Sequence, residues 1–343
     1  MAMKPSFLIL PLFFMSCGIA GQGQPSVTLE SDGKEKKVDI LIDGQLFTSY
    51  RFDDQRKKPV LWPVLSPEGH EITRSYPLKA KAGERVDHPH HVGIWLNYGD
   101  VNGLDFWNNS DAIKPERAAH YGSIHHQKLT KLKSGKGQGT LSVTAVWKAP
   151  AGNTLLDEAT TYTFTAKEQV RIIDRTTTLT AGADTVHFTD NKEGMFGIRV
   201  ARELELPNDK AIKLSDGKGG IVEVEKPDNS KVTGDYLSSE NITGEEVWGT
   251  RAKWMKLFGE IEGEPVAIVI YDHPDNVGYP TYWHARGYGL FAANTLGQKA
   301  MSKGENELNF KLEPGQSTTF KYRVAIFSGK VTKEEIESLA TFN

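Results

Sequence analysis

Residues 139–147, GTLSVTAVW, alternate polar and apolar side chains with a period of two. Because successive side chains of a β-strand point to opposite faces of a sheet, this pattern predicts a strand with one buried face. Two segments continue the series after turns rich in Gly, Pro, Asn or Lys, at residues 156–165 and 170–179. The last one, VRIIDRTTTL, is the strongest single strand prediction. Consecutive strands without intervening helices indicate an antiparallel sheet.

The same pattern extends toward both ends of the chain. Residues 37–50 predict a hairpin around Asp43-Gly44, a favoured two-residue turn. Residues 253–271 predict a second hairpin, and residues 310–327 predict two more strands.

One convincing helix is predicted, at the C-terminal end, where Thr332–Glu335 matches a capping box. Strands at this density predict an all-β fold, a large antiparallel two-sheet β-sandwich that ends in a short C-terminal helix. Because no domain boundary is visible, residues 25–343 are predicted to form a single domain.

The chain has 343 residues, a formal net charge of −3 and 38% hydrophobic residues, which is typical of a soluble globular protein. A charge near zero, without a long basic run, argues against a nucleic-acid partner that is bound by phosphate neutralisation. The near-zero net charge does not exclude an acidic sugar as the ligand, because a local pair of arginines suffices to bind one.

The N-terminal residues 1–24 are predicted to be a signal and linker. Lys4 precedes the apolar run 7–15, which is too short to span a bilayer. Cys17, the only cysteine, lies where a lipoprotein signal carries its acylated cysteine, and cleavage near Ala20 is the alternative. We therefore expect an exported protein, periplasmic or anchored to the outer membrane through a lipid on Cys17. Without another thiol, disulfides and cysteine nucleophiles are excluded from the mature chain.

Three of the ten histidines lie within four positions in Arg85–Trp95, RVDHPHHVGIW. Pro89 disfavours helix, so this run is interpreted as extended chain. On an extended chain His88 and His90 share one face and His91 points the other way. Because each imidazole needs partners for two nitrogens, a packed core has little use for so many, and the run is interpreted as the centre of a site.

Three further segments are rich in the same residue types, at residues 120–126, 193–202 and 271–294. With the first, they hold eight of the ten histidines. Aromatic rings can stack on sugars, arginines bind carboxylate or hydroxyl groups, and histidines move protons near neutral pH. The alternative is that these residues fill turns and sheet edges.

We expect these segments to lie together on one concave face of a sheet, where their side chains would form a site for acid–base chemistry. His90 and His284 are predicted to transfer protons, and Glu193 to orient a histidine or act as the partner acid or base. The predicted substrate-binding residues are Arg85, His88, His91, Trp107, His125, Arg199, His273, Trp283, Arg286 and Tyr288.

A metal site is the second hypothesis. His88 and His90 would supply two nitrogens, and His125, His126, His273 or His284 a third. Hydrogen bonding among these rings or to nearby carboxylates is an equally good interpretation. The sequence contains no H-E-x-x-H helix, nucleotide-binding glycine loop or G-x-S-x-G elbow.

These motifs resemble the PmoA-like family of exported bacterial proteins, over most of the mature chain. The most specific stretches are Asp87–His91, Gly99–Trp107, His273-Pro274 and Trp283–Gly289. Family members often carry a basic residue where this chain has Val92. The methane-oxygenase name of the family fits poorly, because that enzyme needs membrane spans. The resemblance implies a galactose-mutarotase-type β-supersandwich that binds carbohydrate on a concave sheet and uses His, Tyr and carboxylate side chains.

The sequence therefore predicts an exported carbohydrate-active protein, an enzyme of lyase, epimerase or hydrolase type acting on a saccharide that carries a keto or uronic-acid group. The alternatives are a metal-dependent oxidoreductase or hydrolase with histidine ligands, and a non-catalytic glycan-binding protein.

Overall fold

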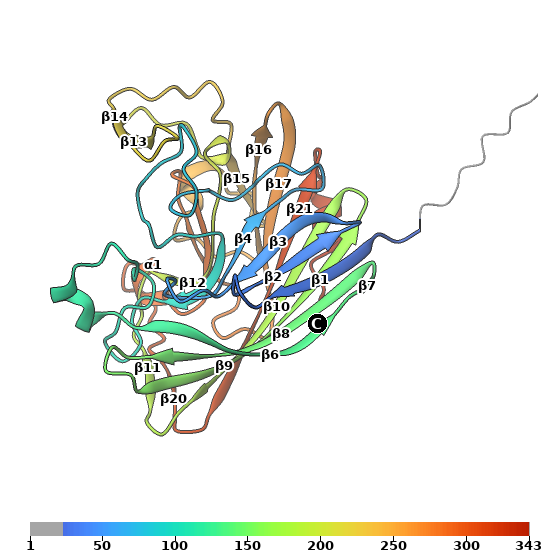
Figure 1. Cartoon of the computed structure of the whole chain (residues 1–343). Helices are drawn as coiled ribbons and strands as arrows, with labels where there is room; N and C mark the ends of the chain where they lie inside the picture. The colour runs from blue at the N-terminus through green and yellow to red at the C-terminus, as the bar shows by residue number, and fades with distance from the viewer. Residues whose placement is uncertain (1–22, 343) are drawn as a thin grey trace, which may run out of the picture.

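Alternating strands build two large sheets in the computed structural model, which describes residues 23–342 (Figure 1). The predicted targeting segment, with Cys17, lies outside the described residues. The first sheet has nine antiparallel strands in the order β18 (Tyr282–Ala285), β19 (Leu290–Asn294), β12 (Gly194–Arg199), β5 (Ile94–Tyr98), β4 (Val60–Val64), β3 (Gln45–Arg51), β2 (Lys37–Ile42), β1 (Ser26–Asp32) and β7 (Gly135–Lys136).

The second sheet has eight antiparallel strands in the order β15 (Asp235–Ser238), β16 (Trp254–Ile261), β17 (Glu264–Asp272), β21 (Ser317–Ser328), β10 (Val170–Ala181), β9 (Thr154–Lys167), β8 (Gln138–Lys148) and β6 (Ser123–Lys133). Two small two-stranded sheets pair β11 (Val186–Phe188) with β20 (Phe310–Leu312) and β13 (Ile212–Ser215) with β14 (Ile221–Val224). The short helices are η1 (Pro115–His120), η2 (Arg202–Leu204), η3 (Gly244–Val247), α1 (Gln298–Met301) and α2 (Lys333–Ser338).

The main core lies between the two large sheets. In β8, every second residue is buried, as the alternation in GTLSVTAVW predicts. The inward side chains of β8 meet those of the facing sheet, so that Leu141 and Val143 share one apolar cluster with Val38 and Ile40 of β2. In Figure 1 the blue strands β1 to β3 lie against the green strands of the second sheet, and β1 contacts β8 and β9.

The outer face of the eight-stranded sheet is covered by the C-terminal segment. Ile336 of α2 and Phe342 pack on Trp254 and Tyr271. The capping box is present, because the Glu335 amide donates to Thr332 Oγ1 and the Thr332 amide donates to a Glu335 carboxylate oxygen. The predicted all-β, two-sheet antiparallel sandwich with a short C-terminal helix is confirmed.

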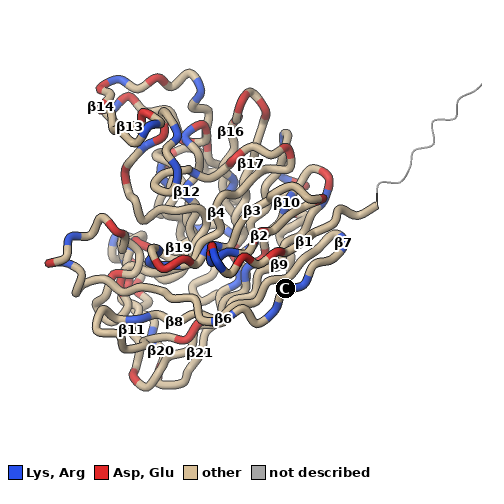
Figure 2. The backbone as a smooth tube through the Cα atoms, in the orientation of Figure 1, with Lys and Arg blue, Asp and Glu red and all other residues tan. Residues whose placement is uncertain are grey.

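Positively and negatively charged residues are interspersed along the chain. In the view of Figure 2, basic and acidic segments alternate along the loops and strands. In the described part of the chain, no helix is long and apolar enough to cross a membrane.

The outer face of the nine-stranded sheet carries a third, smaller apolar cluster. Its members include Trp95 of β5, Leu290 and Ala292 of β19, and Val92 and Trp107 from the loops on either side of β5. The loop that precedes β5 therefore folds over this face of the sheet, and it is the histidine-rich segment of the sequence.

Candidate functional site

Four residues form a row across the outer face of the nine-stranded sheet. The strand registers pair His284 with Ala292, Ala292 with Gly197, and Gly197 with Trp95. The two small residues in the middle leave room for the large ring of Trp95, whose Cζ2 atom would lie 2.8 Å from a Cβ at position 197. Trp107 Cη2 would lie 3.1 Å from the same position.

Replacing Gly197 with Ala should therefore destabilise the protein. The added Cβ overpacks two fully buried indoles, and such overpacking costs about 1–3 kcal/mol. Urea unfolding measures the difference, and Gly33→Ala is the matched control because nothing lies within 4 Å of a Cβ there. The control should change stability by less than about 0.5 kcal/mol. Equal midpoints for the two variants would mean that Trp95 does not occupy this space.

Residues 88–91, the histidine turn, are not extended as the sequence predicted. The His91 amide donates to the His88 carbonyl at 3.0 Å, which closes a turn with Pro89 in its second position. His88 itself has a φ of +43°, in the left-handed region. The prediction was wrong because Pro, which disfavours helix, is equally favoured in this position of a turn. The ring of His91 consequently lies against the ring of His88 instead of opposite to it.

Four rings form a continuous stack that leads from the surface to the sheet. The Tyr288 and His88 centroids are 5.0 Å apart with parallel planes, and those of His88 and His91 are 4.9 Å apart. His91 then stacks on Trp95 at 5.3 Å. His91 and Trp95 are buried, whereas 41% of the His88 side chain is exposed. His88 is therefore the imidazole of the stack that an external molecule can reach.

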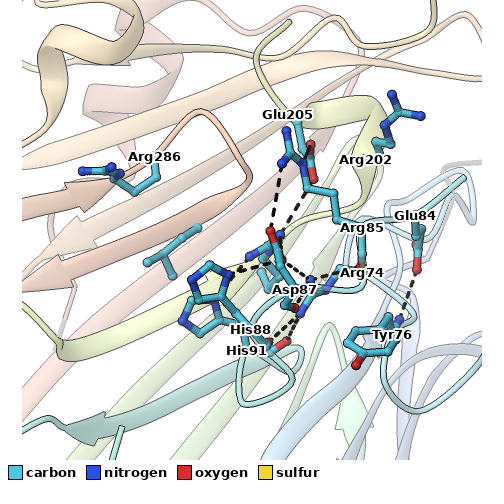
Figure 3. A network of polar contacts seen from close by, with 12 residues as sticks. Arg74, Tyr76, Glu84, Arg85, Asp87, His88, His91, Arg202, Glu205 and Arg286 are labelled. Carbon is cyan, nitrogen blue, oxygen red and sulfur yellow. Dashed lines mark hydrogen bonds and ion pairs between the residues drawn. The ribbon is translucent and has the colours of Figure 1, made fainter. Parts of the chain in front are cut away.

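The Asp87 carboxylate is held by two guanidinium groups and one imidazole (Figure 3). Its Oδ1 atom lies 2.6 Å from Arg199 Nη2, 2.8 Å from Arg74 Nη1 and 3.3 Å from His88 Nδ1. Burial by itself would raise the pKa of Asp87, but the hydrogen bond from His88 and the two guanidinium charges hold it well below its usual range. Asp87 is therefore ionised and fixes the orientation of His88.

Arg74 also holds the backbone of the histidine turn. Its guanidinium donates to the carbonyls of Asp87 and His88 at 2.8 Å and to that of His91 at 3.1 Å. Nothing in the sequence around Arg74 pointed to this role, because its partners lie 11 to 17 positions further along the chain. The positive φ of His88 is thus stabilised by the carbonyl contacts of one buried arginine.

Arg85 and Glu205 complete the Asp87 network, which we define as Arg74, Arg85, Asp87, Arg199 and Glu205. Arg85 Nε donates to Glu205 Oε2 at 2.6 Å, and Arg199 Nη2 lies 3.9 Å from Glu205 Oε1. Burial raises the pKa of Glu205 to about 7. Glu205 lies three residues beyond the predicted segment 193–202, and only the fold brings it to Arg85.

A hollow of about 470 Å³ opens beside the ring stack, and we call it the Arg286 pocket. Its charged and aromatic lining consists of Arg85, Lys210, Glu245, Trp248, Arg286 and Tyr288. Arg286 Cζ lies 5.7 Å from the Trp248 ring centroid and 5.9 Å from that of Tyr288. Figure 3 shows Arg286 on a different segment from the Asp87 network. Trp248, which follows η3, was missed because an isolated tryptophan gives no sequence signal.

Of the predicted proton-transfer residues, His284 is buried and His90 is half-buried. Burial, together with the nearby Lys58 charge, strongly lowers the pKa of His90, and its Nε2 atom is buried without a hydrogen-bond partner. His284 Nδ1 lies 3.7 Å from Glu193 Oε2, and burial lowers the pKa of His284 to about 3. Glu193 thus lies beside His284, in a position to orient it. Both imidazoles are neutral at physiological pH and poorly suited to accept a proton.

These buried imidazoles should make the protein less stable in acid. Burial lowers the pKa of His90, His91 and His284, and His91 Nδ1 lies 3.3 Å from Arg199 Nη1, so it accepts a hydrogen bond as a neutral ring. Below their ordinary pKa of about 6.5, the unfolded chain binds protons that the folded chain does not. Stability therefore falls as pH decreases from about 6.5, by up to about 1.4 kcal/mol per pH unit for each histidine.

Urea unfolding at several pH values measures this slope. The variant His284→Gln should reduce the slope by about one proton, whereas His187→Gln, at an exposed position, should leave it unchanged. An unchanged slope in His284→Gln would show that this ring is protonated in the folded protein.

The structure does not bring three of the predicted residues to this site. His125 is exposed on β6 and its Nε2 atom lies 2.7 Å from Ser123 Oγ. His273 Nε2 lies 2.8 Å from the Phe342 carbonyl oxygen, under the C-terminal segment. Trp283 belongs to the main core, because strand alternation turns it away from the face that carries His284.

Trp107 is at the site but does not line it. Its ring is fully buried, 5.2 Å from the Trp95 ring and 5.8 Å from the His91 ring between centroids. It therefore supports the ring stack from below, whereas the sequence predicted a substrate platform.

The metal hypothesis depends on convergent ligands. Within residues 23–342, no group of three or more His, Cys, Asp or Glu side chains is placed to hold a metal ion. The rings of His88 and His90 are 5.6 Å apart and nearly perpendicular.

Fold and site together define an antiparallel β-sandwich with a histidine–arginine network on the outer face of its larger sheet. The chain belongs to DUF6807, a family of unknown function, whose model matches residues 37–341. No curated protein matches the sequence. The resemblance to the PmoA-like family, drawn from the sequence motifs, remains a prediction.

Several solved structures resemble the fold at low identity. The galactosidase domain of an alpha-galactosidase-sucrose kinase is 8% identical with a TM-score of 0.38, over 88% of this chain and 42% of that one. A galactose mutarotase-like protein from Clostridium acetobutylicum is 10% identical with a TM-score of 0.37, over 89% and 99%. A family 97 glycoside hydrolase from Pseudoalteromonas sp. strain K8, in complex with panose, is 9% identical with a TM-score of 0.29, over 88% and 34%.

This chain thus spans less than half the length of the galactosidase and hydrolase chains. At these scores, the likeness assigns no residue role in this chain.

Proposed function

We propose that this protein is a carbohydrate-active enzyme that binds an acidic saccharide in the Arg286 pocket. The proposed reaction begins when His88 removes a proton from the carbon next to the sugar carboxylate or keto group, a step that elimination and epimerisation share. The observation that carries the proposal is the contact between His88 and Asp87 at the accessible end of the ring stack. The exported location stays a proposal that rests on residues 1–24.

His88 has the features of a general base. Its Nδ1 atom faces the ionised Asp87 carboxylate, so the proton resides on Nδ1 and the lone pair on Nε2. In the described part of the chain, His88 Nε2 makes no hydrogen bond to protein, and the His88 side chain is exposed. The two guanidinium groups on Asp87 fix the carboxylate, and stacking between Tyr288 and His91 fixes the imidazole plane. A base with a fixed orientation and a free lone pair can take a proton from a bound substrate.

Arg286 is suited to the substrate carboxylate. Its side chain is exposed, and among the described residues it forms no ion pair or hydrogen bond through its guanidinium. A guanidinium binds a carboxylate with two parallel hydrogen bonds, and its charge stabilises the negative charge that develops when the adjacent carbon loses a proton. Arg85 lines the same pocket, but its Nε atom donates to Glu205, whose carboxylate offsets part of its charge.

Tyr288 and Trp248 line the pocket and both rings lie close to Arg286, so a sugar bound by Arg286 would meet aromatic surface. Burial raises the pKa of Tyr288 to about 12, so its hydroxyl stays protonated and can donate a hydrogen bond or a proton to a substrate oxygen.

Calorimetric titration with pairs of oligosaccharides tests this assignment, each pair differing only in a uronic-acid carboxylate against a neutral hydroxymethyl group. We expect tighter binding of the acidic member, and a loss of about tenfold or more in Arg286→Met, because a charge-assisted hydrogen bond contributes about 1.5–3 kcal/mol. The matched control Arg117→Met, on the exposed helix η1, should bind like the wild type.

Preference for the neutral sugar, or equal losses in the two variants, would contradict the proposal. Binding of the acidic sugar without any product would instead favour the non-catalytic glycan-binding alternative.

A further inference from the structure

A second cavity of about 270 Å³ lies on the other side of the histidine turn, and we call it the Lys58 cavity. It opens between the segments 55–60, 76–78, 89–92 and 109–112. Much of its wall is apolar, and the residues that matter here are Lys58, Val60, Leu78, Pro89, His90 and Val92. It has no lining residue in common with the Arg286 pocket.

Lys58 is buried, with 5% of its surface exposed. Its Nζ atom donates to the His90 carbonyl at 2.7 Å and lies 5.4 Å from the Trp95 ring centroid. Among residues 23–342, Lys58 forms no ion pair with a carboxylate, and Asp105 acts on it only through longer-range charge. Buried lysines are normally paired, because an ammonium without a counter-ion is expensive to remove from water.

The neutral form of this amine is therefore favoured. Burial lowers the pKa of Lys58 to about 7, and the more distant Asp105 charge only partly offsets this effect. A neutral lysine amine carries a free lone pair and is the nucleophile of imine chemistry. At neutral pH, Lys58 therefore holds far more neutral amine than an ordinary exposed lysine, of which less than about 0.1% is neutral.

His90 provides an independent sign of a ligand. Its Nε2 atom is buried and has no hydrogen-bond partner, although the residue lines the same cavity. Buried polar atoms are normally satisfied, so this orphaned ring nitrogen, in a residue that lines the cavity, indicates a partner that the protein itself does not supply. A hydroxyl or carbonyl oxygen of a small bound molecule fits this requirement.

We propose that the Lys58 amine forms a reversible imine with the carbonyl carbon of a small aldehyde or ketone bound in the Lys58 cavity. The nitrogen lone pair attacks the carbonyl carbon, a C–N bond forms as the C=O π bond breaks, and one proton moves from the nitrogen to the oxygen to give a neutral carbinolamine. This intermediate loses water, made from its hydroxyl group and one further proton, and leaves a protonated imine. The net reaction joins an amine and a carbonyl compound with release of water, and it needs no oxidant or reductant.

Reductive trapping tests this proposal on the full chain. The protein is incubated near pH 7 with cyanoborohydride and either glycolaldehyde or pyruvate, and peptide mass spectrometry locates the modified lysines. We expect Lys58 to be labelled more than about tenfold faster than Lys57, which is more exposed but paired with Asp111 at 2.8 Å. Labelling of Lys58 at or below the rate of Lys57 with both reagents would overturn the proposal.

Two variants separate imine formation from a structural role. Lys58→Arg keeps a positive charge and a donor toward the His90 carbonyl, but its guanidinium forms no stable imine, so labelling at position 58 should disappear and only the slower labelling of Lys57 should remain. Lys57→Arg is the matched control and should leave labelling of Lys58 unchanged. Labelling of Lys58 should also fall by more than about tenfold near pH 5.5, where the amine is protonated. The labelling rates of Lys57 and Lys58 are compared in the wild-type protein, so that test does not depend on whether Lys58→Arg folds.

Discussion

The variant His88→Asn is expected to lose about 10²–10⁴-fold in kcat/KM on an acidic saccharide, the usual contribution of a positioned general base. Asparagine tolerates the left-handed backbone conformation of this position, where φ is +43°, so the turn should be preserved. The side chain amide cannot accept a proton at neutral pH. The loss should therefore appear in turnover, and the unfolding free energy should change little.

Two matched histidine variants make this result specific. His125→Asn, on the exposed strand β6, should retain wild-type turnover. His90→Asn removes the residue that the sequence predicted as a proton-transfer group. A loss in His90→Asn as large as that in His88→Asn would return the role to His90, and full turnover in His88→Asn would refute the assignment.

Replacing Asp87 with Asn should have the largest effect on stability, about 3–5 kcal/mol. The carboxylate is the shared counter-ion of Arg74 and Arg199, whose side chains are 1% and 0% exposed. Without it, two buried guanidinium groups face each other, and the Arg199 charge disfavours the charged form of Arg74. Breaking a buried ion pair by removal of one partner is strongly destabilising, because an uncompensated charge stays in the interior.

Urea unfolding measures this effect against Asp53→Asn. Asp53 pairs with one arginine, Arg56, three positions away at 2.6 Å, and both side chains are more exposed than Arg74 and Arg199. Its replacement should cost no more than about 1 kcal/mol. A similar small cost for Asp87→Asn would mean that water, rather than Asp87, satisfies the two arginines.

The architecture was predictable because it depends on a local pattern. The alternation of polar and apolar residues in 139–147 matches the alternation of exposed and buried side chains along β8. The Asp43-Gly44 turn joins β2 to β3, as expected. Each of these features is decided by neighbours in the chain, and burial of one sheet face enforces the register.

The site was predictable only in part. The histidine-rich segment was recognised, yet the turn at Pro89 was not, because the same residue suits extended chain and turn alike. Arg74 and Lys58 were missed, since neither belongs to a recognised motif and each acquires its partners through tertiary contacts. Trp283 was assigned to the site with its neighbour His284, although strand alternation sends the two to opposite faces.

The most direct test of the central claim is hydrogen exchange at the substrate carbon. An acidic oligosaccharide that binds the protein is incubated with it in heavy water, and NMR follows the proton next to the carboxylate. We expect deuterium to enter this position, or the carbon to lose its proton in an unsaturated product, with wild type and His125→Asn but not with His88→Asn. An unexchanged and intact substrate with the wild-type protein, or exchange that continues at the wild-type rate in His88→Asn, would contradict the account.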